Sequence, residues 1–135
     1  MIDPKLTILG LLSDNWSLGY RPRFSVDWVD SNITLPHVTI RHLVTSPRFY
    51  AFSENLPAED RRISGVYVVD VWSRGDPDQR WEMLGEVDRI LHSKCTSPGG
   101  GLESLTVSAW RDLDEGGLRP PLFRSQTRVE VLYYG

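Results

Sequence analysis

The sequence has almost no cysteine, since Cys95 is the single one in the chain. No disulfide can form within the chain, and a zinc site built from several cysteines is excluded. We therefore expect a protein of a reducing compartment. The sequence also lacks an apolar run of the roughly 20 residues that a membrane-spanning helix needs. Its first residues, Met1–Lys5, lack the basic and apolar parts of a signal peptide, so no contact with a membrane is expected.

An excess of basic charge is also missing. Lys and Arg total 15 residues against 18 of Asp and Glu, which gives a formal net charge of -3 at pH 7. Binding to nucleic acid irrespective of sequence needs a concentrated basic surface, and no run of Lys and Arg predicts one here. The length of 135 residues predicts a single domain, residues 1–135, with a hydrophobic core of its own.

The usual motifs of catalysis and metal binding are absent from the sequence. His37, His42 and His92 stand neither beside the cysteine nor at the spacing of zinc ligands. The glycines of Gly99–Gly101 are not followed by the Lys and Ser or Thr of a phosphate-binding loop. No serine lies in the Gly-x-Ser-x-Gly pattern of a nucleophile elbow. We expect neither a cofactor nor a metal, and we do not expect an enzyme.

Two acidic positions leave an alternative open. Asp70 lies within an apolar strand pattern, where an unpaired carboxylate would be costly, so it predicts an ion pair with an arginine or a wet subunit boundary. Residues Asp112–Glu115 could hold a cation through carboxylate oxygens, although a solvated acidic turn is the favoured interpretation. The alternative function is a small metal-dependent enzyme that uses Asp70 with Asp112 and Asp114.

The stretch Ser64–Leu91 combines a strong strand pattern with a strong helix pattern. Residues 64–73 are rich in β-branched and aromatic side chains, which is typical of a strand. Asp76 and Pro77 then predict the N-cap and first residue of a helix that runs to Leu91. Alternation in the strand places Val66, Val68 and Trp72 on one face and Tyr67, Val69 and Val71 on the other. Because both faces are apolar, we expect a central strand covered on both sides or by a neighbouring subunit.

The remaining patterns complete the predicted fold. Asp3 and Pro4 predict a first helix that ends at Ser13 or Asp14. Further strands are predicted over residues 24–28, 36–44, 102–113 and 122–134. Polar residues on the outward faces of two of these strands include His37, Thr39, Arg41, Arg124, Arg128 and Glu130. The order predicts an α+β fold, a mainly antiparallel sheet of about five strands with two helices packed on it.

A long loop is expected at about residues 45–62, between the second predicted strand and the central one. Its prolines and charged residues are typical of loops, yet Arg48, Phe49, Tyr50 and Phe52 stand in the middle. Aromatic residues next to an arginine are typical of a protein interface. Alternatively, the loop folds these aromatic side chains back onto the core.

Several short motifs together resemble the tail-completion, or tail-terminator, proteins of long-tailed bacterial and archaeal viruses. The pattern Val69-Asp70-Val71-Trp72-Ser73 precedes a polar turn and a helix that ends in Ile90-Leu91. Pro36-His37-Val38-Thr39-Ile40 and the last strand, Arg128–Leu132, are similar to the early and final strands of that family. The order of elements matches from about Leu6 to Tyr134, while residues 45–62 and 119–121 have no counterpart.

The resemblance implies a structural protein that forms a ring, commonly a hexamer, on the finished tail tube and meets the head–tail connector. DNA would pass through the lumen without specific binding. The protein would lie in the virion, at the head-proximal end of the tail, after assembly in the host cytoplasm. A neck or head-completion protein and a cellular ligand-binding domain are the competing interpretations. The residues expected at subunit or partner interfaces are Arg48, Phe49, Tyr50, Phe52, Asp70, Trp72, Arg74 and Asp76.

Overall fold

The computed structural model describes residues 3–27, 35–48, 62–74, 76–113 and 122–134. Two helices and a six-stranded, mostly antiparallel sheet confirm the expected α+β class, with one strand more than predicted. The elements in chain order are α1 (Pro4–Asn15), β1 (Arg23–Val26), β2 (His37–Arg48), β3 (Arg62–Arg74), α2 (Pro77–Ser93), β4 (Leu102–Val107), β5 (Arg111–Asp112) and β6 (Leu122–Tyr134).

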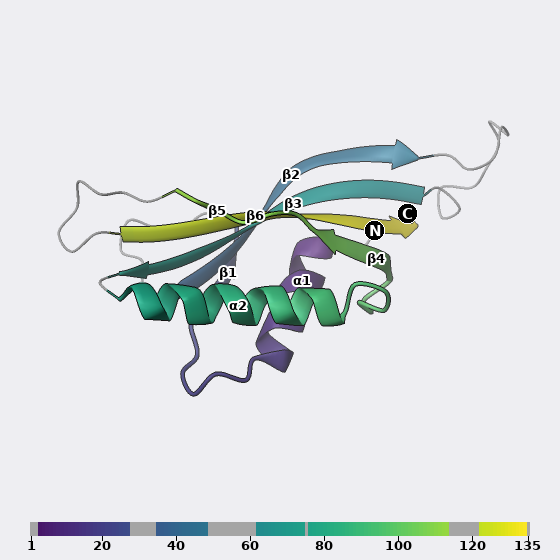
Figure 1. The fold of residues 1–135 in the computed structure, drawn as a ribbon. Helices are drawn as coiled ribbons and strands as arrows, with labels where there is room; N and C mark the ends of the chain where they lie inside the picture. The colour runs from purple at the N-terminus through teal and green to yellow at the C-terminus, as the bar shows by residue number, and fades with distance from the viewer. Residues whose placement is uncertain (1–2, 28–34, 49–61, 75, 114–121, 135) are drawn as a thin grey trace, which may run out of the picture.

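The strand β3 is the centre of the sheet, as its apolar composition predicted. The sheet order is β1-β2-β3-β6-β4, and β5 pairs with β6 beyond the end of β4 (Figure 1). Only β1 and β2 are parallel, while every other described pair is antiparallel. Along its whole length β3 pairs with β6, from Arg62 opposite Tyr134 to Arg74 opposite Leu122. The two long neighbours, β2 and β6, therefore fix the register of every residue of β3.

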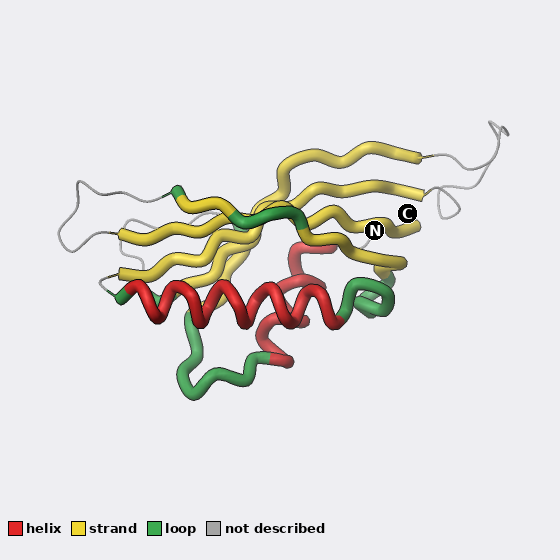
Figure 2. Tube along the Cα trace, in the orientation of Figure 1, coloured by secondary structure: helices red, strands yellow, loops and turns green. Residues whose placement is uncertain are grey.

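Both helices lie on the same side of the sheet (Figures 1 and 2). The helix α1 contacts β1 and β2, whereas α2 contacts β3, β4 and β6, and the two helices also contact each other. Among the described residues no helix lies on the other face. Within the described part of the chain, β3 is therefore covered by helices on one face only. Cover by a neighbouring subunit stays a prediction.

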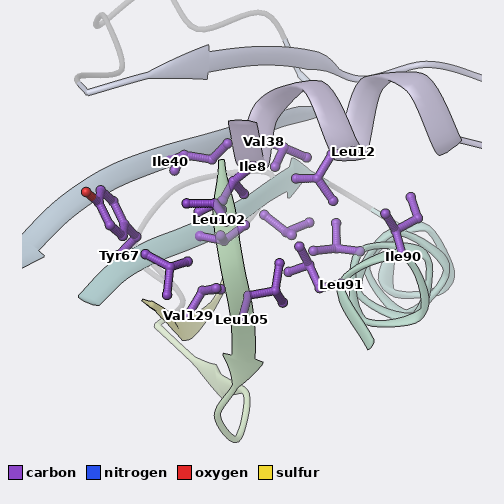
Figure 3. Close-up of a cluster of buried hydrophobic side chains, with 14 of the residues drawn as sticks. Ile8, Leu12, Val38, Ile40, Tyr67, Ile90, Leu91, Leu102, Leu105 and Val129 are labelled. Atoms are coloured by element: carbon purple, nitrogen blue, oxygen red, sulfur yellow. The ribbon is translucent and has the colours of Figure 1, made fainter. Parts of the chain in front are cut away.

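The hydrophobic core fills the space between the helices and the inner face of the sheet. Tyr67, Val69 and Val71 of β3 are buried there, which confirms the face that alternation assigned to them. Figure 3 shows side chains from both helices and from the strands pointing toward one another in this layer. The fully buried members of the core are Ile8, Leu12, Val38, Ile40, Val69, Met83, Val87, Ile90, Leu91, Val129 and Val131.

Each helix begins at an aspartate followed by a proline, as predicted. Asp3 accepts a hydrogen bond from the backbone N–H of Lys5 at 3.1 Å, and Asp76 accepts one from Asp78 at 3.0 Å. Proline suits the position after the cap because its missing N–H would have no partner in the helix. The helix α1 ends at Asn15, slightly beyond the predicted end, and α2 continues to Ser93. Local capping chemistry therefore sets where both helices start.

The expected loop at residues 45–62 is shorter than predicted, because both of its ends belong to strands. Residues 45–48 continue β2, and Arg48 pairs with Arg62 of β3. The strand tolerates Pro47 because β1 pairs only with the first part of β2, so among the described residues one edge of β2 has no partner strand there. A bulge between His42 and Val44 shifts the register of β2. This explains why the alternation of inward apolar and outward polar residues along β2 breaks at Leu43. Residues 49–61 lie outside the described part of the chain.

The predicted strand at residues 102–113 is two strands instead. β4 ends at Val107, and the chain leaves β6 before β5 begins at Arg111. In the break, the hydroxyl of Thr127 donates to the carbonyls of Ser108, at 2.9 Å, and of Ala109, at 3.3 Å. Since the backbone N–H of Ser108 still donates to the carbonyl of Arg128 at 2.8 Å, these side-chain hydrogen bonds supplement an interrupted ladder. Of the strand predicted at 24–28, the structure has residues 23–26, and Trp28 lies outside the described residues.

The glycine turn before β4 gives a first test of the packing. Gly99 and Gly100 both have positive φ, 76° and 60°, and an added Cβ at Gly100 would lie 2.6 Å from the Thr7 side chain of α1. At Gly99 the same Cβ would meet nothing within 4 Å. We expect Gly99→Ala to lower the free energy of unfolding by about 1 kcal/mol, through backbone strain alone. Gly100→Ala should cost about 2 kcal/mol, because the clash adds to the strain. Urea unfolding would measure both, and equal losses would contradict this packing.

Candidate assembly surfaces

The face of the sheet opposite the helices is the first candidate surface, and we call it the outer sheet face. Strand pairing places side chains from every strand on it, because residues paired across strands share a face. Among the residues whose side chains the structure describes, its members are Arg23 and Ser25 of β1; His37, Thr39, Arg41 and Val44 of β2; Ser64, Val66, Val68, Asp70, Trp72 and Arg74 of β3; Ser104 and Thr106 of β4; Arg111 of β5; and Leu122, Arg124, Gln126, Arg128, Glu130 and Leu132 of β6.

Asp70 lies in the middle of this face and is completely buried by its neighbours. Arg41 approaches one carboxylate oxygen with its Nε and Nη2, each at 3.3 Å. Arg124 donates from Nε to the other oxygen at 3.2 Å, and Gln126 donates to that same oxygen at 2.9 Å. Of the two alternatives predicted for Asp70, the ion pair with an arginine is therefore confirmed, with two arginines in place of one. Its buried charge is stabilised by ion pairs from both neighbouring strands.

Trp72 extends this network along β3. Its indole N–H donates to the hydroxyl of Thr39 at 3.1 Å. The guanidinium of Arg124 lies over the indole ring, 4.8 Å from the ring centre, while it also binds Asp70. One arginine thus joins a carboxylate to an aromatic ring by an ion pair and a cation–π contact. Contacts within the single chain therefore hold the side chains in the middle of the outer sheet face in defined positions.

The outer sheet face is strongly basic, although the whole chain has a net charge of -3. Among the members just named, its carboxylates are Asp70 and Glu130. Its arginines are Arg23, Arg41, Arg74, Arg111, Arg124 and Arg128. Most of these arginines are exposed, while Arg41 and Arg124 have 35% and 23% of their side chains exposed. The carboxylates that make the net charge of the chain negative therefore lie outside this face.

A shallow depression of about 280 Å³ lies at one side of this face. It forms where the chain leaves β6 between β4 and β5, and Arg111 and Arg128 are both part of its lining. The other lining residues are Ser108, Ala109, Gln126 and Thr127. Two exposed guanidiniums beside hydroxyl and amide groups make this a place for an acidic group of a partner.

The second candidate surface lies on α2, and we call it the acidic Trp81 surface. It consists of Asp76, Asp78, Trp81 and Glu82, all exposed, with 68% of Trp81 accessible to solvent. Trp81 and Glu82 follow Asp78 by three and four positions, so all three lie on one side of the helix. The buried apolar residues of α2 are Met83, Val87, Ile90 and Leu91, and Trp81 precedes them on the opposite side of the helix. A large exposed aromatic residue among carboxylates is typical of a binding surface.

Tyr20 touches the edge of the acidic Trp81 surface. Its hydroxyl donates to Glu82 at 3.2 Å. Burial, and then the hydrogen bond and charge of Glu82, raise the pKa of Tyr20 from 10 to about 12. The folded state therefore favours the protonated phenol, so this contribution to stability is present below pH 10 and is lost as the pH rises through 12.

Absorbance titration of the phenolate tests this contact. Tyr20→Phe should remove one transition near pH 12, the value to which the pKa of Tyr20 is raised. Glu82→Gln should return the pKa of Tyr20 only part of the way to 10, because burial is the larger cause. A wild-type Tyr20 that titrates at its ordinary pKa would show that the contact does not form.

The predicted interface residues do not form one site. Asp70 and Trp72 lie together on the outer sheet face, Arg74 is exposed at the end of β3, and Asp76 caps α2. Arg48 ends β2 at the opposite end of the sheet, roughly 40 Å from Arg74 at about 3.3 Å per strand residue. The side chain of Arg48 lies outside the described part, as do residues 49–61 with Phe49, Tyr50 and Phe52.

The carboxylates of the metal-enzyme alternative do not converge. Asp70 pairs with Gln126 on the outer sheet face, whereas Asp112 pairs with Ser125 on the inner face. Asp112 accepts a hydrogen bond from Ser125 at 2.8 Å and binds Arg80 of α2 at 3.2 Å. Asp114 lies outside the described residues, and the described ranges contain no cluster of His, Cys, Asp and Glu suited to a metal. The sheet separates Asp70 and Asp112, so they cannot share one ion.

Fold and surfaces together define a small α+β protein with one sheet, helices on one face and charged surfaces on opposite sides. No protein-family model matches the sequence, and a search of curated proteins gives no significant match. Neither described helix combines the length and apolar character that a membrane span requires.

Proposed function

We propose that this chain is a structural virion protein, a tail terminator, whose copies form a ring on the head-proximal end of the tail tube. The sequence motifs around Asp70 and Trp72 suggest this family. The observation that carries the proposal is the outer sheet face, which has no helix on it in the described part and whose central side chains are already fixed. Such a surface suits a protein that works by binding other subunits.

The geometry of the Asp70 network supports this role. Binding costs free energy whenever flexible side chains must be ordered, at about 0.5–1.5 kcal/mol for each long side chain. Arg41 and Arg124 are held by Asp70, and Arg124 also stacks on Trp72, so part of that ordering has already taken place. Arginine and tryptophan are also the residues that contribute most often to protein interfaces.

The proposed partners are other copies of this chain, the tail tube protein and the head–tail connector protein. DNA would pass through the lumen without specific binding. A lumen that lets DNA slide should not display exposed arginines, since each phosphate contact slows the strand. The outer sheet face should therefore be turned away from the lumen and be covered by protein in the assembled tail.

Electron microscopy of purified components tests the proposal. The protein would be mixed with polymerised tail tubes and, separately, with DNA-filled heads of a virus whose genome encodes the chain. We expect rings on one end of the tubes and on no other part of them. Binding to heads alone would favour the competing neck or head-completion role. No binding to either would overturn the proposal.

A further inference from the structure

The two candidate surfaces have opposite charge and lie on opposite sides of the protein. The described side chains of the outer sheet face include six arginines and two carboxylates, while the acidic Trp81 surface has three carboxylates around one exposed tryptophan. The sheet lies between them, because α2 packs on the inner face. Apart from Arg74 and Asp76, which are two positions apart at the turn between β3 and α2, the sheet separates the two surfaces within one chain.

We infer that the acidic Trp81 surface of one copy docks on the outer sheet face of the next copy. The occupant of the basic face is thus a second molecule of the same protein. The inference deepens the proposed function and rests on it for the closure of a ring. The contact itself needs neither tail tube nor head, so it can be tested with the purified chain.

The contact has a definite symmetry. Each copy would offer its sheet face to one neighbour and its α2 surface to another, so the interface joins two different patches. Such a heterologous contact cannot close as a two-fold dimer. It continues from copy to copy until it closes into a ring or extends as a filament. Two complementary patches on different sides of each copy are therefore compatible with a ring, and the rotation between neighbouring copies decides whether it closes.

The chemistry of the two surfaces is complementary at the level of side chains. Arg111 and Arg128 are exposed at the depression on the sheet face, where Asp78 and Glu82 of the neighbour would form ion pairs with them. Trp81 would supply an apolar and aromatic anchor on which an arginine can stack. The contact would also cover arginines that would otherwise hold DNA in the lumen.

A charge exchange tests the inference. Arg111→Glu/Arg128→Glu makes the sheet site acidic, and Asp78→Arg/Glu82→Arg makes the α2 surface basic. Either pair of substitutions places like charges together, and we expect it to weaken self-association by about a hundredfold or more. The protein with all four substitutions has both charges exchanged, and its self-association should return. Sedimentation velocity from micromolar to millimolar concentration would measure the three variants and the wild type.

Two controls separate the contact from general effects of charge or folding. Asp14→Arg changes an exposed carboxylate of α1 outside both surfaces, and it should leave self-association unchanged. Trp81→Ala removes the anchor without changing charge and should weaken self-association about tenfold or more. Circular dichroism would show that each variant is folded, since all the changed side chains are exposed. Added salt should weaken the wild-type contact.

The outcomes separate this inference from the proposed function. Wild type that stays monomeric at millimolar concentration, or a fourfold variant that does not recover, would overturn the inference. If such a protein still formed rings on tail tubes, the proposed function would stand and another surface would make the ring. If Arg111→Glu/Arg128→Glu lost binding to duplex DNA but not self-association, the basic face would serve a polyanion, and the inference would fall.

Discussion

Replacing Asp70 with asparagine should lower the free energy of unfolding by about 2–3 kcal/mol. The variant keeps the size of the side chain but leaves Arg41 and Arg124 without the anion that pairs with them. Removing one partner of a fully buried ion pair costs about 3–5 kcal/mol. We expect less here, because both guanidiniums are partly exposed and water can reach them. The melting temperature should fall by about 10 °C.

Arg128→Ala is the matched control for this substitution. Arg128 lies on the same face, opposite Val68, but it is exposed, so its loss should change the free energy by less than about 0.5 kcal/mol. Urea unfolding of wild type and the two variants would give the comparison. An Asp70→Asn protein as stable as the wild type would show that the carboxylate does not organise the outer sheet face.

Replacing Leu12 with alanine should cost about 3–4 kcal/mol. Leu12 is fully buried between α1 and the sheet, and burial of this kind typically makes a leucine-to-alanine change cost about 2–5 kcal/mol through lost burial and the cavity that remains. The helix α1 has few other anchors, since Ile8 is its only other fully buried side chain among the described core residues. The variant should therefore loosen the whole helix.

Leu6→Ala makes the same chemical change on the same helix at a position that is 58% exposed. It should alter the free energy of unfolding by less than about 0.5 kcal/mol. Chemical unfolding would measure both variants, and hydrogen exchange in α1 would show whether the helix opens locally. Similar losses at the two positions would mean that α1 does not pack on the sheet as described.

The Asp70 network also connects stability with assembly. Its residues lie next to the arginines that the inferred contact uses, so Asp70→Asn should disturb the centre of the surface as well as the fold. The exposed charges around it can be exchanged with little effect on the folded chain. This difference allows assembly to be tested by variants that remain folded.

Much of the fold was predictable because it depends on local chemistry. Asp3 and Asp76 begin helices through hydrogen bonds to residues two positions away. Alternation in the strands assigned Tyr67, Val69 and Val71 to the core correctly, and the outward side of Arg124 and Arg128 was also correct. Such features need only the periodicity of a strand and the geometry of a helix end.

The predicted strand boundaries failed where the ladder depends on neighbouring strands. Residues 45–48 have the composition of a loop, yet they belong to β2 because β3 offers backbone partners beside them. The break between β4 and β5 depends on Thr127, which lies on a strand that is distant in sequence. Backbone hydrogen bonds between strands do not require particular side chains, so the composition of residues 45–48 did not reveal their pairing.

The sequence by itself determined the two helices, the central strand and the need of the buried Asp70 carboxylate for a compensating group. Only the tertiary structure decided which arginines supply it, because Arg41 is 29 positions away and Arg124 is 54 positions away. Strand register also gathered several arginines on one face of an acidic protein, and the packing of α2 left Trp81 on the opposite side. Periodicity gives the side of one strand on which a residue lies. The pairing of strands alone decides which residues share that side, and therefore where charge accumulates.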